Sequence, residues 1–133
     1  MKEKSRPVSG PRNIGPTDLL TYSFPITAIA SITHRVAGAF LFFSIGLCLG
    51  VLHYSLESEQ HFNTLIRFFS SYLGKAIVWV VLAGLSYHFV AGIKHLIMDF
   101  GIGETLEGGT LLAKTTVFLS VSLMLLAGIW LAL

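Results

Sequence analysis

Residues 76–93 read AIVWVVLAGLSYHFVAGI, an uncharged run that is bounded by Lys75 and Lys94. A run of this length and apolarity is about what a helix needs to cross the hydrocarbon core of a bilayer. Lipid offers the backbone no hydrogen-bond partners, so a single spanning segment must be helical. These residues therefore predict a transmembrane helix, and they set the class of the protein.

Two further apolar runs, residues 36–52 and 115–133, also lack charged side chains. Each is about long enough to span a bilayer as a helix. We therefore predict an all-α membrane protein with three transmembrane helices, as part of a heteromeric helical bundle. We expect a polar N-terminal segment at residues 1–25 and a membrane anchor domain at 26–133. The spans within that domain are expected at about residues 27–53, 72–98 and 111–133.

The composition supports lipid as the solvent. Hydrophobic residues make up 53% of the 133 residues and charged residues only 12%, about half the charged share of a typical soluble domain. The first 25 residues are polar and contain no apolar core of a signal peptide, so the first span is expected to direct insertion. The single cysteine, Cys48, excludes an internal disulfide and is expected to pack as a small apolar residue.

The orientation follows from the distribution of the nine lysines and arginines. The N-terminal side and the connection between the second and third spans carry Lys2, Lys4, Arg6, Arg12, Arg35, Lys94 and Lys114, whereas the other side carries Arg67 and Lys75. Cytoplasmic segments are enriched in positive charge. We therefore predict that the N-terminus lies in the cytoplasm, or on the equivalent matrix side, and that the C-terminus lies on the opposite side of the membrane.

Polar side chains gather in the first turns of the first span. Thr27, Ser31, Arg35 and Gly38 recur at helical spacing, with His34 beside them. In one interpretation the charged groups extend to the headgroups and the hydroxyls bond their own helix. In the other, this stripe binds a ligand with a polar head and an apolar tail, for which Ser31 donates to a carbonyl and Arg35 stabilises negative charge. Spacing alone leaves both interpretations open.

A second polar group lies inside the second span. His88 is flanked by Gly84 and Gly92, each four residues away on the same face. Small residues leave room for a flat cofactor or for a neighbouring helix, and neutral imidazole is a good iron ligand. The alternative is a histidine that hydrogen-bonds across a helix contact. His95 lies farther along roughly the same face, near the interface, where it could reach a haem propionate or water.

The whole pattern resembles the cytochrome b556 subunits of bacterial succinate dehydrogenase. The resemblance spans nearly the whole chain and is carried by three stretches. Arg6-Pro7 precedes the first span, residues 24–35 (FPITAIASITHR) match an S-x-x-H-R motif, and residues 88–101 (HFVAGIKHLIMDFG) match an H-x-x-x-G-x-[basic]-H…D-x-G motif. The family usually has arginine where this chain has Lys94, so Lys94 is not included in the predicted site.

The resemblance implies a set of roles for these residues. His88 is implied as one axial ligand of haem b, with the second histidine supplied by a partner anchor subunit. Ser31 and Arg35 are implied to line the ubiquinone site on the cytoplasmic side, and His34 is implied near the haem propionates, which His95 could also reach.

The function that the resemblance implies is a membrane-anchoring cytochrome b subunit of succinate dehydrogenase, part of an enzyme but not active as an isolated chain. The location that it implies is the inner membrane of a bacterium, with the C-terminus periplasmic. The implied partners are a second hydrophobic anchor subunit, an iron–sulfur subunit, a flavoprotein subunit, ubiquinone and the lipid bilayer, with no nucleic acid. Two alternatives stay open: a quinol:fumarate reductase anchor, and a non-redox assembly or transport component. No phosphate-binding loop, paired metal-ligand cysteines or nucleophile–base motif indicates catalysis within the chain.

Overall fold

The computed structural model describes residues 23–133, and these form four helices. They are α2 (Ile26–Glu57), α3 (Glu59–Ser70), α4 (Tyr72–Asp99) and α5 (Leu106–Ala132). Three of them, α2, α4 and α5, are long and apolar enough to cross a membrane. The predicted all-α membrane class is therefore confirmed. The predicted segment 1–25, including Arg6 and Pro7, lies almost wholly outside the described residues.

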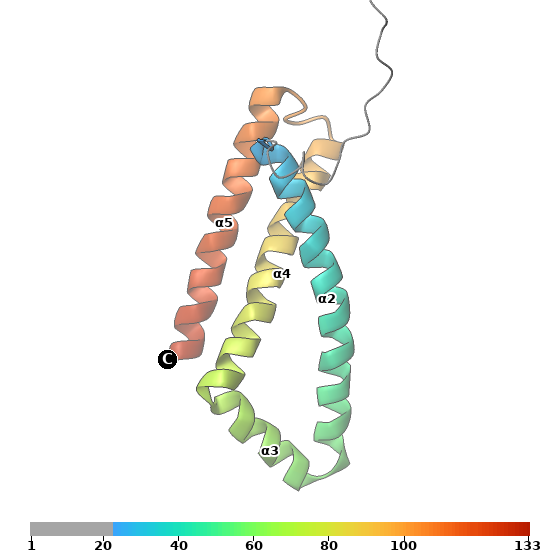
Figure 1. Cartoon of the computed structure of the whole chain (residues 1–133), viewed down its shortest axis with the longest axis vertical. Coiled ribbons are helices and arrows are strands. Elements are labelled where there is room, and N and C mark those ends of the chain that lie inside the picture. Colours follow the sequence, from blue (N-terminus) through green and yellow to red (C-terminus); the bar gives the residue numbers. More distant parts are fainter. Residues whose placement is uncertain (1–22) are drawn as a thin grey trace, which may run out of the picture.

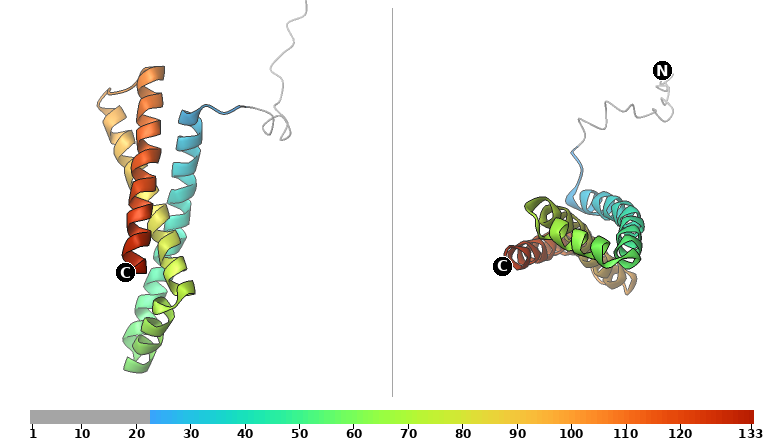
Figure 2. Two further views of the ribbon diagram at one scale, coloured as in Figure 1. Left: turned by 90° about the vertical axis from the view of Figure 1, so that its left-hand side faces the viewer. Right: turned by 90° about the horizontal axis from the view of Figure 1, so that it is seen from below.

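The three long helices run side by side, with α4 between α2 and α5 (Figure 1). The start of α2 lies at the same end of the molecule as the connection between α4 and α5, and we call this the loop end. At the other end, the α3 end, α2 and α4 separate and α3 crosses between them, as the view from below in Figure 2 shows. Residues of α2 and α4 therefore meet chiefly at the loop end, whereas α4 and α5 also meet toward the α3 end, where the indole of Trp79 donates to the carbonyl of Met124.

Local sequence explains where the helices begin. The side chains of Ser58, Ser71 and Thr105 each accept a hydrogen bond from a backbone N–H in the first turn of α3, α4 and α5. Within the spans, hydroxyls such as those of Ser44 and Ser86 donate to the carbonyl four residues earlier. This bond satisfies a hydroxyl inside an apolar helix without a partner from another chain.

The connection between α4 and α5 is shorter than the sequence pattern predicts. The expected spans leave residues 99–110 between them, but α5 already begins at Leu106. Thr105 caps the helix, and Gly108 packs closely on Gly103, to whose Cα a side-chain carbon at position 108 would come within 2.8 Å. Gly103 itself has a φ of 81°, a left-handed conformation that favours glycine. The turn is therefore compact, and α5 extends beyond the predicted start of the third span.

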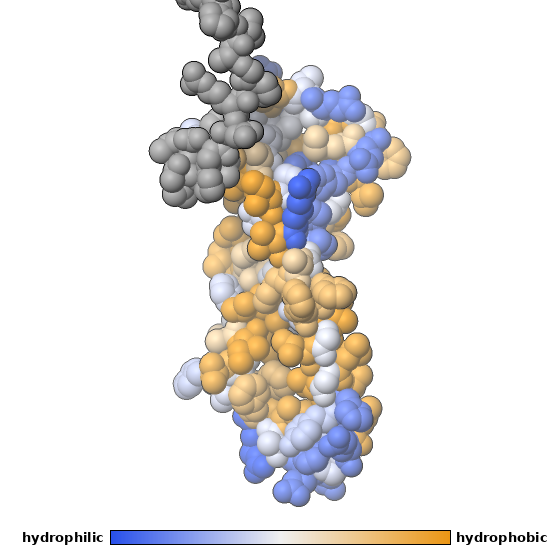
Figure 3. Space-filling model, turned by 45° about the vertical axis from the view of Figure 1, so that its right-hand side comes forward, coloured by the Kyte–Doolittle hydropathy of each residue, from blue (hydrophilic) through white to orange (hydrophobic). Residues whose placement is uncertain are grey.

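Most of the apolar surface is not covered by the chain itself. Among the hydrophobic residues of the described part, only Ala30, Val90, Ala91 and Ala113 are buried. Figure 3 shows a hydrophobic belt between two hydrophilic ends. A surface of this kind is stable only in lipid or against other apolar subunits.

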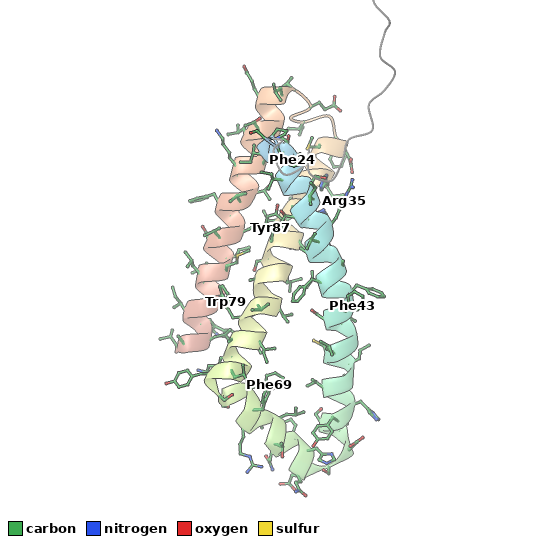
Figure 4. The ribbon with its side chains drawn as sticks, in the orientation of Figure 1. Phe24, Arg35, Phe43, Phe69, Trp79 and Tyr87 are labelled. Carbon is green, nitrogen blue, oxygen red and sulfur yellow. The ribbon has the colours of Figure 1, made fainter. Side chains whose placement is uncertain are left out.

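A groove of about 410 Å³ opens where α2 and α4 separate. It is lined almost wholly by apolar groups, with Cys48 on its α2 wall and Phe69 of α3 directed into it (Figure 4). This groove lies toward the α3 end and is distinct from the polar residues at the loop end.

Candidate functional site

Three histidines come together between α2 and α4 near the loop end. The rings of His34 and His88 are stacked, with their centroids 4.3 Å apart and an interplanar angle of 21°. The His95 ring lies 5.1 Å from that of His34. The structure thus brings together His34, His88 and His95, although they come from two different spans.

The two nitrogens of His88 have different surroundings. Nδ1 lies 3.3 Å from the main-chain carbonyl oxygen of His34, a long hydrogen bond. A carbonyl only accepts, so this bond requires the proton on Nδ1. The lone pair of the neutral ring is then on Nε2, which forms no hydrogen bond with any residue in the described range 23–133. This is the arrangement of a metal-ligating imidazole whose other nitrogen is held by a carbonyl.

Glycines set the spacing of α2 and α4 around this cluster. A side-chain carbon added to Gly38 would lie 2.9 Å from Cε1 of His88. One added to Gly84 would lie 2.9 Å from the ring of Phe40, and one added to Gly92 would lie 4.0 Å from Nε2 of His34. The interpretation of Gly84 as room for a flat cofactor is therefore wrong, because Phe40 of the neighbouring helix fills that space.

A tyrosine fixes the register between the two helices. The hydroxyl of Tyr87 donates to the carbonyl oxygen of Ala30 at 3.0 Å, and Figure 4 shows Tyr87 between α2 and α4. Tyr87 precedes His88, and Ala30 precedes Ser31, so this bond joins the two predicted sites. Tyr87 was not among the predicted site residues. Its position next to His88 in an apolar span was the available signal, because a half-buried phenol there needs a hydrogen-bond partner.

Ser31 and Arg35 lie one helical turn apart on α2. Ser31 is half-buried and Arg35 is exposed; Figure 4 shows Arg35 near the loop end. Neither side chain forms a hydrogen bond or ion pair with another residue of the described part of the chain. In contrast, Thr33 nearby donates to the carbonyl of Ile29. The hydroxyls of the predicted stripe belong to Thr27 and Ser31, and neither forms a hydrogen bond to its own helix within the described residues; Thr33 lies outside that stripe.

Lys94 is buried, with 7% of its surface exposed. Its amino group forms no hydrogen bond or ion pair within residues 23–133, but it is not among the fully buried atoms that lack a partner. Nε2 of His34, in contrast, is buried without a hydrogen-bond partner in that range. Buried polar groups are costly unless they are paired, so this corner of the site is electrostatically incomplete in the isolated chain.

The described residues contain no cluster of three or more metal-binding side chains, whether His, Cys, Asp or Glu, that could hold a metal ion. His53 and His61 lie at the α3 end, where both approach the carboxylate of Glu57, at 3.4 Å and 3.0 Å. They are thus remote from the His88 cluster.

Comparisons with known proteins identify the family of the chain. Residues 10–127 match the family described as the succinate dehydrogenase/fumarate reductase transmembrane subunit. The chain is 37% identical over 115 residues to the succinate dehydrogenase cytochrome b556 subunit of Coxiella burnetii, which covers 85% of this chain and 91% of that protein. It is 34% identical over 98 residues to the protein of the same name from Paracoccus denitrificans, covering 74% and 75% of the two chains. The counterpart from Rickettsia felis is 28% identical over 108 residues, covering 81% and 84%. This chain therefore belongs to the family of succinate dehydrogenase and fumarate reductase transmembrane subunits.

Proposed function

We propose that the chain is a haem-bearing membrane anchor of succinate dehydrogenase, in which His88 supplies one axial ligand of haem b. The observation that carries this proposal is the geometry of His88. Its Nδ1 is engaged by the carbonyl of His34, and its Nε2 is left as a ligand atom. When bound, a haem supplies an iron centre that takes up and releases one electron within the membrane.

The residues around His88 fit such a group. A second ligand to the iron would come from a histidine of another chain. The unpaired Nε2 of His34 and the neighbouring His95 could donate to the propionate carboxylates. Lys94, buried beside them, adds positive charge that favours an anionic group at this place.

Ser31 and Arg35 would form this chain's part of a quinone-reducing site. A quinone takes up two electrons and two protons to become a quinol, and negative charge develops on its carbonyl oxygens as electrons arrive. The free hydroxyl of Ser31 can donate to one carbonyl oxygen, and the guanidinium of Arg35 can stabilise the charge. The electrons would come from succinate through a flavoprotein and an iron–sulfur subunit. A second anchor subunit would complete the membrane part.

The direction of the reaction in this proposal is succinate oxidation. The family as a whole includes fumarate reductases, but the relatives reported above are all named as succinate dehydrogenase subunits. A non-redox assembly or transport component, the remaining alternative, requires no haem.

The optical spectrum of the complex tests the proposal. In the complex purified with this chain, His88→Leu should remove or strongly weaken the α-band of reduced cytochrome b. The control is His53→Leu, which makes the same substitution at a side chain that is 81% exposed and lies at the far end of α2. An unchanged α-band in the His88 variant would show that the haem ligand lies elsewhere. A complex without any b-type spectrum would favour the non-redox alternative.

A further inference from the structure

We propose that His34, through its main-chain carbonyl, and Gly38, through its lack of a side chain, are positioning residues for His88. They hold its imidazole in one tautomer and one orientation, with Nε2 as the coordinating atom. This inference rests on the proposed function, because it takes His88 to be a haem ligand. It assigns a role to one turn of α2 that the motif itself does not reveal.

The space between position 38 of α2 and the imidazole of His88 is too small for a side chain. A carbon atom on Gly38 would lie 2.9 Å from Cε1 and 3.4 Å from Nδ1 of His88. The first distance is shorter than a carbon–carbon contact at its optimum of about 3.5–4.0 Å. Any residue other than glycine at position 38 must therefore push the imidazole out of its position, or push α2 away from α4.

Glycine at position 38 also leaves the main-chain carbonyl of His34 accessible to His88. In an α-helix, side chains lean toward the N-terminus and cover the preceding turn. A side chain at position 38 would thus lean over the carbonyl of His34, which lies four residues earlier. Glycine leaves this oxygen open, and a carbonyl oxygen has a second lone pair besides the one used by the helix. The Nδ1 of His88 lies 3.3 Å from this oxygen.

The same turn of α2 also contacts the flat face of the His88 imidazole. The ring of His34 stacks on that of His88 with a centroid distance of 4.3 Å. The hydrogen bond between Tyr87 and Ala30 holds the register of the two helices one residue before His88. The position of His88 is thus determined by α2 before any cofactor is present, and a preorganised ligand loses less freedom on binding.

The chemistry of the hydrogen bond adds a consequence for the iron. A hydrogen bond from the second nitrogen of a ligating imidazole to a carbonyl raises the basicity of the ligand. Weakening that bond should change the electronic properties of the haem even where the haem stays bound. A role limited to helix packing would leave those properties unchanged.

The test compares Gly38→Ala with Gly50→Ala in the purified complex. Gly50 lies on the same helix, and a carbon added there would meet nothing within 4 Å in this chain. Gly38→Ala should weaken haem binding by about five- to 150-fold, the factor that corresponds to the usual strain of an overpacked methyl group. Any haem that remains should have a shifted reduction potential and altered g values in the ferric electron paramagnetic resonance spectrum, which depend on the orientation of the axial imidazole. Gly50→Ala should retain the wild-type values.

A double-mutant cycle covers the case in which Gly38→Ala fails to assemble. If the methyl group clashes with the imidazole, then His88→Ala removes the clash. The variant that carries both substitutions should then assemble as well as His88→Ala alone. If the double variant stays as defective as Gly38→Ala, the methyl group disturbs something other than His88, and the inference is overturned.

The outcomes separate the inference from the proposed function. If Gly38→Ala gives the haem content, potential and g values of Gly50→Ala, the positioning role is wrong while His88 can still be the ligand. If the α-band survives His88→Leu, the proposed function itself is wrong. The two failures arise from different variants and cannot be confused.

Discussion

At the level of single residues, the side chains of Ser31 and Arg35 form no hydrogen bond or ion pair with a described residue and are therefore free to bind a ligand. Thr33 and Ser44 on the same helix donate to backbone carbonyls. A free hydroxyl and a free guanidinium one turn apart, at the loop end, are suited to a polar headgroup whose tail lies in lipid. The motif named these residues, and the structure adds that no other described side chain competes for them.

Removing either group should impair quinone reduction. We expect Ser31→Ala to lower the rate with ubiquinone about two- to tenfold, and Arg35→Ala to lower it more than about tenfold, since hydrogen bonds to charged groups are stronger. Succinate oxidation by a soluble artificial acceptor should be unchanged. Both rates are measured on the same membranes. Ser122→Ala serves as the control, because the Ser122 hydroxyl is bonded to the carbonyl of Phe118. Full quinone turnover in both variants would remove Ser31 and Arg35 from the site.

The sequence could predict the reactive residues but not the groups that hold them. His88 stood out because an imidazole inside an apolar span is rare and needs a partner. The contacts of Gly38 and Tyr87 depend on how α2 and α4 pack, and helical periodicity within one span carries no information about the register between two spans. The same limitation explains the error at Gly84. A glycine indicates an open space, but not whether a cofactor or Phe40 occupies it.

At the level of elements, the corner between α3 and α4 is the closest backbone approach at a glycine in the described part of the chain. Gly74 is buried in the first turn of α4. A side-chain carbon there would overlap the carbonyl oxygen of Phe68 and lie 2.6 Å from Cα of Phe69. These are backbone atoms, which cannot move aside as the end of a side chain can. The angle at which α3 leaves α4 therefore depends on this glycine.

Gly74→Ala should destabilise the anchor by about 1–3 kcal/mol, the usual cost of overpacking. Gly46→Ala, where a carbon would meet nothing within 4 Å of this chain, should be neutral or stabilising by up to about 1 kcal/mol, because alanine loses less backbone entropy in a helix. The thermal midpoint of the purified complex measures the difference. Equal midpoints for the two variants would mean that the corner is not rigid.

The order and number of the long helices could be predicted from the apolar runs, because lipid permits few other structures. Their ends could be predicted less well. Residues 99–109 look like a loop by composition, yet Thr105 caps α5 and Glu107 lies in its first turn. Glycines that normally end helices are here used for close packing, which only the folded turn reveals. The connection between the first two spans, for which the apolar runs predicted no helix, contains the short helix α3.

At the level of the whole molecule, the two ends should lie on opposite sides of the membrane, with the loop end in the cytoplasm. The positive-inside rule predicts this from the seven-to-two distribution of lysine and arginine. Cysteine labelling in intact cells tests it, with Cys48→Ser as the background. A membrane-impermeant maleimide that reaches the periplasm should modify Gln60→Cys in α3 but modify Glu104→Cys only after lysis. Both positions are exposed, so the two sites are matched in accessibility. The reverse pattern would invert the topology and place Ser31 and Arg35 on the periplasmic side.

The unpaired groups at the loop end bear on how long the chain survives after synthesis. Nε2 of His34 is buried without a hydrogen-bond partner among the described residues. Lys94, with 7% of its surface exposed, places a charge within a span and forms no ion pair with a described residue. Polar atoms without a partner make a span less stable in lipid. Membrane quality-control proteases can act on such a span. Copies made in excess of the other subunits should thus be degraded rapidly, so that the amount of this chain follows theirs. A pulse–chase experiment in cells lacking the other subunits of the complex should show a much shorter half-life than in wild-type cells. Replacing Lys94 by Met should lengthen it.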